Sequence, residues 1–316
     1  MPPLCFKNGK DESMKSNSYK LKNRTVQASY HLMLLPGMLF VLVFNYIPMF
    51  GIIMAFQDYV PAKGILRSEW VGLKHFIDLF NNSDIWEILR NTVTISLGKI
   101  LLRTLMALVF AILLNEIRAM RLKKCVQTIV YLPHFLSWVI LANVFANMFG
   151  LTGSVNTFLG NFGIERINFL GSNKLFQPFV IATDVWKEFG YASIMYLAAI
   201  TAIDPMLHEA AAMDGASWLQ RIWHITLPGM LPIIVLVAAT DLAGILNAGF
   251  DQIYNLYSVG VYETGDILDT YVYRVGMIDL QYSFSTAVGL IKSVVGMILM
   301  ISVNEFSKKF ANRSVF

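Results

Sequence analysis

Long apolar blocks alternate with shorter polar segments along the 316-residue chain. A helix needs roughly 20 residues to cross the ~30 Å hydrocarbon core of a bilayer, and each block is close to that length. The blocks predict six membrane-spanning helices, at about 30–56, 91–114, 126–149, 176–202, 228–249 and 282–303. The pattern therefore predicts an all-α fold, that of a polytopic membrane protein with about six transmembrane helices.

The predicted spans divide the chain into a basic N-terminal segment, a membrane domain and a short tail, at 1–29, 30–304 and 305–316. The first segment is polar and lysine-rich and lacks the short apolar core of a cleavable secretory signal. The first span is therefore expected to direct its own insertion and to stay in the protein. Three connections contain Gly, Asn, Asp and aromatic residues, and small folded caps or short interfacial helices are plausible there: 57–90, 150–175 and 250–281.

Composition supports a membrane protein, because 56% of the residues are hydrophobic and only 15% are charged. A soluble domain carries about 25% charged residues. Lys and Arg gather in the N-terminal segment, in the link at 115–125 and in the tail, whereas the 250–281 connection is mostly acidic. The positive-inside rule then places both termini, and the polar segment at 203–228, on the cytoplasmic side of the cell (inner) membrane. The net charge of +4 follows from this distribution and needs no nucleic acid partner.

Sequence motifs for catalysis or metal binding are missing. The chain has no GxxxxGK[ST] phosphate loop, no HExxH helix and no GxSxG elbow. His208-Glu209 begins like a zinc motif, but Ala212 stands where the second histidine would be. Cys5 and Cys125 are far apart and show neither CxxC nor Cys/His spacing, so two reduced thiols are expected. We therefore expect a chain that is not an enzyme, with no metal and no cofactor of its own.

The polar segment between the fourth and fifth spans predicts two short helices with a fixed bend. Asp204-Pro205 is a helix start, with a carboxylate cap followed by proline at the first helical position. Gly215 ends that helix, since glycine readily takes the left-handed conformation of a C-terminal cap. Ser217 can cap a second helix, and Pro228 then opens the fifth span. One face of the segment carries small side chains: Ala210, Ala211, Ala212 and Ala216. Composition alone also allows an amphipathic loop that covers the end of a helical bundle.

The spacing within this segment is more specific than its composition. It runs Glu-Ala-Ala, three residues, Gly, nine residues, Ile, one residue and Leu-Pro, and it resembles the EAA signature of the membrane subunits of ATP-binding-cassette importers. The matching positions, with the aspartate before the glycine, are Glu209, Ala210, Ala211, Asp214, Gly215, Ile225, Leu227 and Pro228. In that family the loop, here 203–228, holds the coupling helix that docks in a groove of the ATPase subunit. The resemblance implies the MetI-like permease fold, with ATP and Mg bound by partner subunits rather than by this chain.

Three other stretches narrow the resemblance. Residues 131–138, 250–254 and 270–276 look like parts of permeases for complex carbohydrates, relatives of the maltose-type membrane subunits. The resemblance implies a permease domain at 30–304 that imports an oligo- or polysaccharide delivered by an extracytoplasmic sugar-binding protein. The partners it implies are a second homologous permease subunit, in a heterodimer or a homodimer, two ATPase subunits and the lipid bilayer.

Ionisable side chains inside the spans are candidate functional groups, because a charge at mid-bilayer is costly unless it faces a cavity or a partner. They are Lys99, Arg103, Asp184, Lys187, Glu188, Asp241 and Lys292. In the fourth span, the lysine can pair with either carboxylate of its own helix, a purely structural role. The cations of the second and sixth spans have no carboxylate on their own helices, so we predict that they line the substrate path. Such a cationic path would suit an acidic sugar chain, such as a uronate oligosaccharide.

Aromatic side chains offer flat apolar surfaces to sugar rings. The candidates in or beside the spans are Trp138, Trp186, Tyr191, Tyr196, Phe250 and Tyr254. Most aromatic residues in spans serve as interfacial anchors or as packing. The predicted substrate path combines a few of these rings with the ionisable groups.

Two other interpretations stay open. An ion-coupled secondary transporter of a polar solute would use Asp184, Glu188 or Asp241 as its ion site, although such proteins usually show repeat-related halves and broken helices. A membrane enzyme that acts on lipid-linked glycans would need a catalytic cluster, which the sequence does not reveal.

Overall fold

The computed structural model describes residues 24–311, with side chains described for 29–305 and for Lys308. Most of the predicted N-terminal segment (1–23) and the last residues of the predicted tail (312–316) lie outside the described residues. The chain divides into two compact units, Met1–Gly51 and Ile52–Phe316, and each is described by itself.

The described part of the first unit is a nearly continuous helix. It comprises α1 (Arg24–Val41), the π-helical turn η1 (Leu42–Tyr46) and α2 (Ile47–Met49), and it leads into the 3-10 turn η2 (Phe50–Phe56). The side chains over 29–50 are exposed, which suits a membrane-embedded helix. This segment is the first predicted span.

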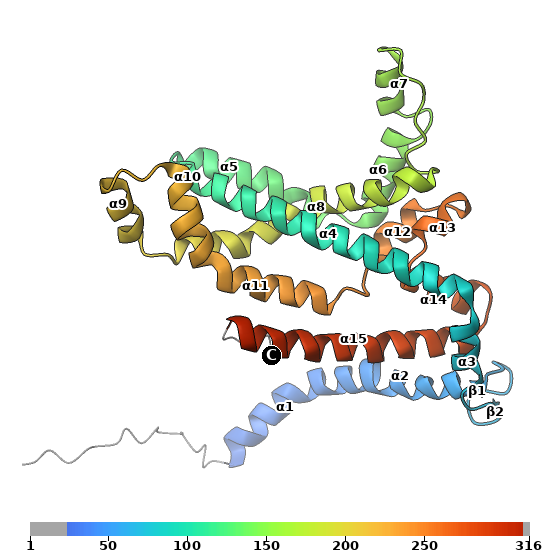
Figure 1. Ribbon diagram of the computed structural model, residues 1–316. Coiled ribbons are helices and arrows are strands. Elements are labelled where there is room, and N and C mark those ends of the chain that lie inside the picture. Colours follow the sequence, from blue (N-terminus) through green and yellow to red (C-terminus); the bar gives the residue numbers. More distant parts are fainter. Residues whose placement is uncertain (1–23, 312–316) are drawn as a thin grey trace, which may run out of the picture. The chain divides into compact units, whose positions relative to one another are not determined.

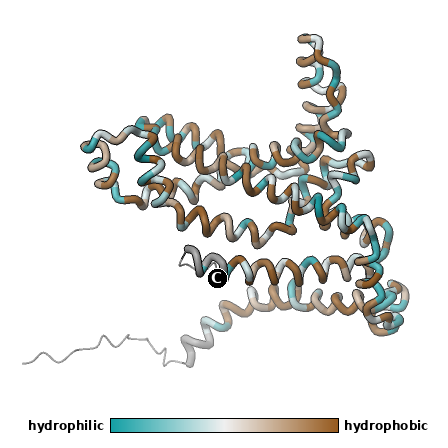
Figure 2. Tube along the Cα trace, in the orientation of Figure 1, coloured by the Kyte–Doolittle hydropathy of each residue, from teal (hydrophilic) through white to brown (hydrophobic). Residues whose placement is uncertain are grey.

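Four long helices form the second unit's main layer (Figure 1). They are α4 (Ser83–Glu116), α8 (Asn173–Thr201), α11 (Leu227–Ala243) and α15 (Tyr282–Ala311). α4 packs mainly against α8, and α11 packs against α15 and α8. Apolar residues run along these helices, whereas hydrophilic residues gather toward the ends (Figure 2). Buried side chains such as Ile95, Phe176 and Met230 fill the space between them.

The number of spans agrees with the sequence prediction. Within the described residues, five helical segments are long and apolar enough to cross a membrane: Ser29–Phe56, Ser83–Glu116, Trp138–Gly160, Trp218–Ala243 and Tyr282–Glu305. α8 and α9 (Pro205–Met213) meet at a bend of 69°. If this bent pair counts as one further span, the number of spans rises to six. α8 carries the three charged residues of the predicted fourth span, Asp184, Lys187 and Glu188. The all-α fold with about six spans is confirmed.

The third predicted span, 126–149, is wrong as a continuous helix. The chain forms α5 (Met120–Tyr131), the 3-10 turn η3 (Leu132–Phe135), α6 (Trp138–Phe149) and, beyond it, α7 (Ser154–Gly160). Pro133 has no N–H with which to continue the helix, and Leu136 is extended. The Ser137 hydroxyl then accepts the Ile140 amide at 3.4 Å and caps α6.

The fifth span starts earlier than predicted. Its helix begins with α10 (Trp218–Arg221) and continues through the π turn η4 (Ile222–Thr226) into α11. The prediction that Pro228 opens the span is therefore wrong. In the π turn the Leu227 amide bonds to the Ile222 carbonyl, which widens the helix where the proline ring would otherwise clash.

The fifth span also ends earlier than predicted. α11 stops at Ala243, and Gly249 takes a left-handed conformation with φ 95°. The chain then turns into α12 (Phe250–Leu256). This break brings the backbone around residue 249 close to α4, as the contacts described below show.

Short elements lie at the end where α4 and α15 begin (Figure 1). β1 (Gln57–Asp58) pairs antiparallel with β2 (Glu69–Trp70), and α3 (Lys74–Asn81) follows. After α12 the chain forms η5 (Val259–Val261), α13 (Tyr262–Gly265), α14 (Leu268–Tyr273) and the π turn η6 (Arg274–Ile278). With α7, these elements confirm the folded caps expected in the three connections.

Candidate functional site

Two groups of predicted residues lie at different levels of the second unit. The first is the projection, defined here as residues 204–221, which contains α9 and α10. It lies at the same end as the link between α4 and α5, which we call the basic end, and β1, α3 and α14 lie at the opposite end (Figure 1). The second group consists of the ionisable side chains between the long helices.

Both helices of the projection start at the caps that the sequence predicts. The Asp204 carboxylate accepts the Met206 amide at 3.0 Å and caps α9. The Ser217 hydroxyl accepts the Gln220 amide at 3.4 Å, and the Gln220 side chain accepts the Ser217 amide at 2.7 Å. This reciprocal capping box fixes the start of α10.

The bend between the two helices is a Schellman cap centred on Gly215. Gly215 has φ 80°, and its amide bonds to the Ala212 carbonyl at 3.1 Å. The Ala216 amide bonds to the Ala211 carbonyl at 2.9 Å. These bonds satisfy the last carbonyls of α9 and set the direction of the chain, so the predicted helix stop is confirmed.

The residues that carry the EAA pattern are accessible to varying degrees. Exposed residues are Glu209, Ala210, Asp214, Gly215 and Pro228, and half-buried ones are Ala211, Ile225 and Leu227. Met213, Leu219 and Trp223 are also 88%, 56% and 63% exposed. The EAA pattern does not include these three residues, although large apolar residues in a polar segment are a usable signal of a binding surface. Exposed apolar side chains beside small ones mark a surface suited to binding another protein.

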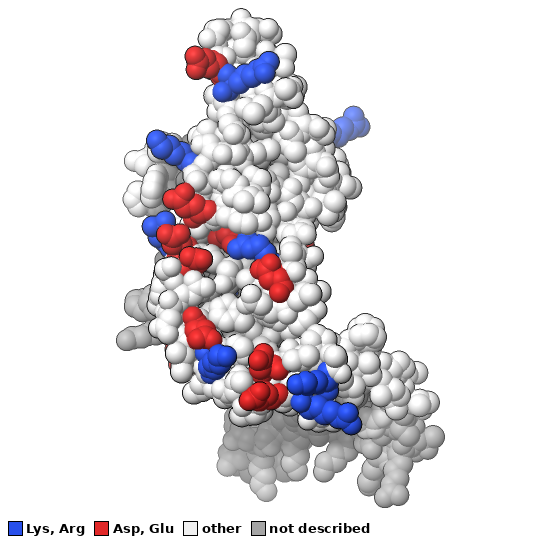
Figure 3. Space-filling model, turned by 90° about the vertical axis from the view of Figure 1, so that its right-hand side faces the viewer, with Lys and Arg blue, Asp and Glu red and all other residues white. Residues whose placement is uncertain are grey.

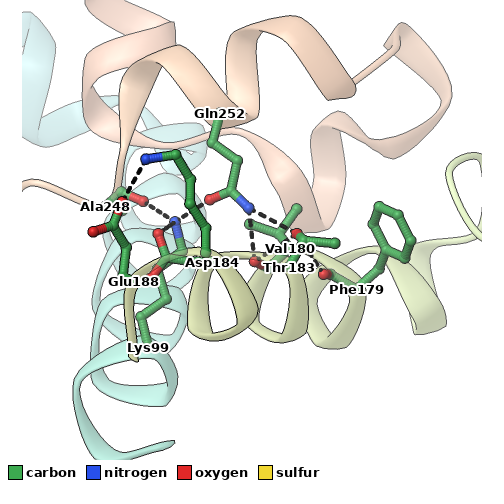
Figure 4. Close-up of polar contacts among 9 residues, drawn as sticks. Lys99, Phe179, Val180, Thr183, Asp184, Glu188, Ala248 and Gln252 are labelled. Atoms are coloured by element: carbon green, nitrogen blue, oxygen red, sulfur yellow. Dashed lines mark hydrogen bonds and ion pairs between the residues drawn. The ribbon is translucent and has the colours of Figure 1, made fainter. Parts of the chain in front are cut away.

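Lys99, on α4, is buried at the centre of the polar groups between the helices (Figure 4). Its ammonium donates to the Ala248 carbonyl at 2.7 Å and to the Gln252 side-chain oxygen, and it lies 3.4 Å from the Asp184 carboxylate. The Gln252 amide in turn donates to the Val180 carbonyl at 2.8 Å. An ammonium has three donors, and here all three have partners within the chain. Lys99 therefore joins α4 and α8 to the break after α11.

Arg103 lies one turn further along α4 and forms an ion pair with Asp241 of α11 at 3.0 Å. Their side chains are 24% and 25% exposed, against 7% and 11% for Lys99 and Asp184. The Arg103 pair borders a cavity between α4, α8 and the C-terminal part of α11 with the loop that follows it. Other side chains and backbone at this cavity are Ser96, Lys99, Asp184, Glu188, Thr240, Gly244, Asn247 and Gly249. The cavity thus presents a guanidinium and carboxylates side by side.

A third polar cluster fixes the break in the third span. Lys187 pairs with Glu188 at 2.6 Å, one of the two structural pairings that the sequence allows. Glu188 also contacts the His134 ring at 2.6 Å, and Lys187 donates to the His134 carbonyl at 2.9 Å. The His134 ring stacks on Tyr191 with 3.8 Å between centroids. These contacts hold η3 against α8.

The three cations predicted to line the substrate path border cavities, and each has a carboxylate partner from another helix. Besides the Lys99 and Arg103 pairs, Lys292 of α15 pairs with Asp269 of α14. Lys292 also borders a separate cavity between α11 and α15. The intramembrane charges therefore balance locally, which lowers the cost of burying them.

The aromatic candidates do not share one site. Tyr196 is fully buried in a core cluster with Ala107 and Met230, so it is a packing residue and the prediction of a sugar contact is wrong for it. Trp138 begins α6, with the Lys187 ammonium 5.5 Å from its ring centre. Trp186 is 47% exposed.

Phe250 and Tyr254, both aromatic candidates, stack on each other at 5.2 Å between ring centroids. Both lie on α12, directly after the Gly249 break. Tyr273 of α14 lies 5.0 Å from Tyr254 and completes an aromatic group at the opposite end.

The opposite end carries acidic and basic side chains, several of them next to one another, on an otherwise uncharged surface (Figure 3). Arg274 pairs with Asp266 at 2.5 Å and lies over the Tyr262 ring at 4.3 Å, contacts that the sequence analysis missed. Burial alone would lower the pKa of Arg274, but the hydrogen bond and the charge of Asp266 raise it above its ordinary value. The Arg274 guanidinium therefore stays charged, and its contact with Asp266 ties η6 to the loop before α14.

The sequence of this chain matches a known protein family and is similar to individual proteins of known name. Residues 103–312 match the family described as binding-protein-dependent transport system inner membrane component. The chain is 43% identical over 304 residues to the polygalacturonan/rhamnogalacturonan transport system permease protein YteP of Bacillus subtilis (strain 168), covering 96% of this chain and 95% of that protein. It is 41% identical over 287 residues to the protein LplB of the same organism, covering 90% of each.

Solved structures show the same arrangement of helices. A chain in the crystal structure of a bacterial ABC transporter involved in the import of the acidic polysaccharide alginate matches with a TM-score of 0.83 and 37% identity, covering 90% of this chain and 97% of that chain. A chain in the crystal structure of a bacterial alginate ABC transporter in complex with alginate pentasaccharide-bound periplasmic protein matches with the same TM-score and identity, covering 92% and 98%.

Proposed function

We propose that this chain, which belongs to the binding-protein-dependent transport system inner membrane component family, is the permease subunit of an ATP-binding-cassette importer for acidic oligo- or polysaccharides. Relatives that span nearly its whole length are named for polygalacturonan, rhamnogalacturonan and alginate. The observation that best supports the substrate class is the sequence identity of 43% to YteP and of 37% to the chain of the alginate transporter. Both proteins are named for uronate-containing polysaccharides.

The projection would receive the motion of an ATPase subunit. Its two caps and the Schellman turn make it rigid, and its exposed small and apolar side chains offer a surface that a groove can grip. In this proposal ATP and Mg bind the partner subunits, and this chain contributes the path and the lever without hydrolysing anything. The projection must be rigid, because it transmits the motion of an ATPase subunit only if it does not deform.

The proposed assembly contains a second homologous permease subunit, two ATPase subunits and an extracytoplasmic binding protein. The alginate pentasaccharide-bound periplasmic protein in the second solved structure supports the binding protein. The proposed location is the inner cell membrane, with both termini and the projection in the cytoplasm, as the distribution of Lys and Arg favours. The cavity beside Arg103 and Asp241 is the proposed part of the sugar path.

The ion-coupled transporter is not favoured. The break in the third span is a feature that such a transporter would share, so broken helices alone do not separate the two functions. Membership of the binding-protein-dependent family does separate them, because it implies partner proteins that an ion-coupled carrier does not need.

The proposal is tested by the assembled importer in proteoliposomes, with ATP inside and binding protein loaded with trigalacturonate outside. We expect uptake that requires ATP and persists without an ion gradient. Gly215→Val should abolish uptake while ATP hydrolysis continues, because a β-branched residue is strained at φ 80°. Gly215→Asn should keep most of the uptake, since asparagine tolerates the left-handed conformation. Uptake that follows an ion gradient and ignores ATP would refute the proposal.

A further inference from the structure

The ion pairs around the cavity differ in how firmly each is held. Lys99 has three partners and is almost fully buried, so its ammonium is fully occupied by contacts within the protein. Arg103 has Asp241 as its one ion-pair partner within the described part of the chain, and both side chains are about a quarter exposed (24% and 25%). A guanidinium has five N–H donors, so most of those on Arg103 are not used by this single contact.

The position of the Arg103 pair suits contact with a solute. Arg103 comes from α4 and Asp241 from α11, so the pair crosses one side of the cavity. The neighbouring Lys99 pair forms a fixed wall, and Glu188 borders the same cavity but is held by Lys187 and His134. Of the charged groups at the cavity, the Arg103–Asp241 pair is therefore the one that can open at least cost.

We propose that the Arg103–Asp241 ion pair selects for charge: a carboxylate of the sugar chain replaces Asp241 on the Arg103 guanidinium as the sugar enters the cavity. The proposal rests on the proposed import of acidic sugars and names the residue pair that favours them over neutral ones. Asp241 is the built-in competitor, and Arg103 is the specificity-determining cation.

The exchange has a simple energetic basis. A carboxylate that replaces another carboxylate keeps the guanidinium paired, and planar carboxylates fit the guanidinium fork. Asp241, once released, remains at the border of a polar cavity, where its side chain is already partly accessible. A neutral sugar offers hydroxyl groups but no charge. It would leave two separated charges in a poorly solvated space, which is costly.

Binding to the assembled, nucleotide-free importer in detergent tests the exchange without the selectivity of the binding protein. The probes are radiolabelled trigalacturonate and its fully methyl-esterified form, which has the same rings without the charges, measured by equilibrium dialysis. We expect the wild type to bind the acid more tightly than the ester. Arg103→Gln should weaken acid binding about tenfold, which is about 1.4 kcal/mol, and leave ester binding nearly unchanged.

Two further variants separate selection from folding. Arg103→Lys, which keeps the charge, should retain most of the preference for the acid. Asp241→Asn removes the competitor, so it should bind the acid more tightly than the wild type, a gain that misfolding cannot produce. Equal losses of acid and ester in Arg103→Gln, or weaker acid binding in Asp241→Asn, would overturn the exchange.

Uptake of trigalacturonate by the wild-type importer separates this inference from the proposed function. If the wild type takes up the acid but binds acid and ester equally, or binds neither measurably, the exchange is refuted and the proposed function stands. If the wild type takes up no acidic sugar at all, both are refuted.

Discussion

Lys99 stabilises the break that follows α11. Its ammonium bonds to the Ala248 carbonyl at 2.7 Å, one residue before Gly249. A Cβ atom at position 249 would lie only 2.9 Å from the same ammonium, and the glycine has φ 95°. Glycine is therefore required there both by backbone conformation and by the close approach of the lysine. Lys99 therefore has a structural role, because its ammonium lies where a side chain at position 249 would be. Arg103, in contrast, is partly accessible.

Replacing Lys99 by methionine should destabilise the fold strongly. It would leave the Asp184 carboxylate buried without its ion-pair partner, and breaking a buried pair costs about 3–5 kcal/mol. Thermal unfolding of the purified complex, followed by tryptophan fluorescence, would measure the loss. The double variant Lys99→Met/Asp184→Asn should recover part of it, because the orphaned charge is gone.

A surface pair provides the matched control for that experiment. Lys308 contacts Glu305 at 2.8 Å on α15, and their side chains are 46% and 66% exposed. Lys308→Met should change stability by no more than about 1 kcal/mol, as is usual for exposed pairs. Equal unfolding temperatures for Lys99→Met and Lys308→Met would contradict the structural role of Lys99.

The positions of the intramembrane charges could be predicted from the sequence, but their partners could not. A charge in an apolar block is visible locally, and Lys187 with Glu188 is a neighbouring pair. Arg103 and Asp241, in contrast, meet only because α4 and α11 border the same cavity. The sequence therefore does not reveal the charge balance of the predicted path, because that balance depends on tertiary contacts between helices.

At the scale of elements, local signals predicted the projection and missed the breaks in the spans. The caps of α9 and α10 depend on residues within a few positions of one another, so the sequence contains them in full. Pro133 is a local signal for a break in the third span. The geometry of η3, however, also depends on contacts with Lys187 and Glu188 of α8. At Pro228 a π turn accommodates the proline, an outcome that no local propensity indicates.

Close packing of α8 on α5 depends on a glycine, which gives a prediction at the element scale. A Cβ atom on Gly190 would lie 2.4 Å from the Val130 carbonyl oxygen, a backbone atom that cannot turn aside. Gly190→Ala should therefore push the two helices apart and cost about 1–3 kcal/mol. Thermal unfolding of the complex in detergent would measure it.

Gly289 of α15 is the control, because nothing lies within 4 Å of an added Cβ there. Gly289→Ala should be neutral or stabilising by up to about 1 kcal/mol, since alanine favours a helix over glycine. If Gly190→Ala proved as stable as Gly289→Ala, the inference that the close packing of α8 on α5 depends on Gly190 would be wrong.

At the scale of the whole molecule, the second unit has two chemically different ends. The basic end carries the projection and the link with Arg118, Arg121, Lys123 and Lys124. The opposite end carries the short elements β1, α3 and α12 to α14 with both signs of charge (Figure 3). The positive-inside rule predicts that the basic end faces the cytoplasm, and the proposed contact with an ATPase requires that orientation.

Single cysteines at the two ends would determine the orientation. In a background with Cys5→Ser and Cys125→Ser, Leu66→Cys marks the opposite end and Met213→Cys marks the projection, where the native side chains are 98% and 88% exposed. A membrane-impermeant maleimide should label the first in intact cells with a permeabilised outer layer, and the second only in inverted vesicles. Because an odd number of spans separates the two positions in the proposed topology, labelling of both from one side would contradict the span assignment. The reverse pattern would place the projection outside, where no ATPase subunit could reach it, and would remove the mechanical basis of the proposed import.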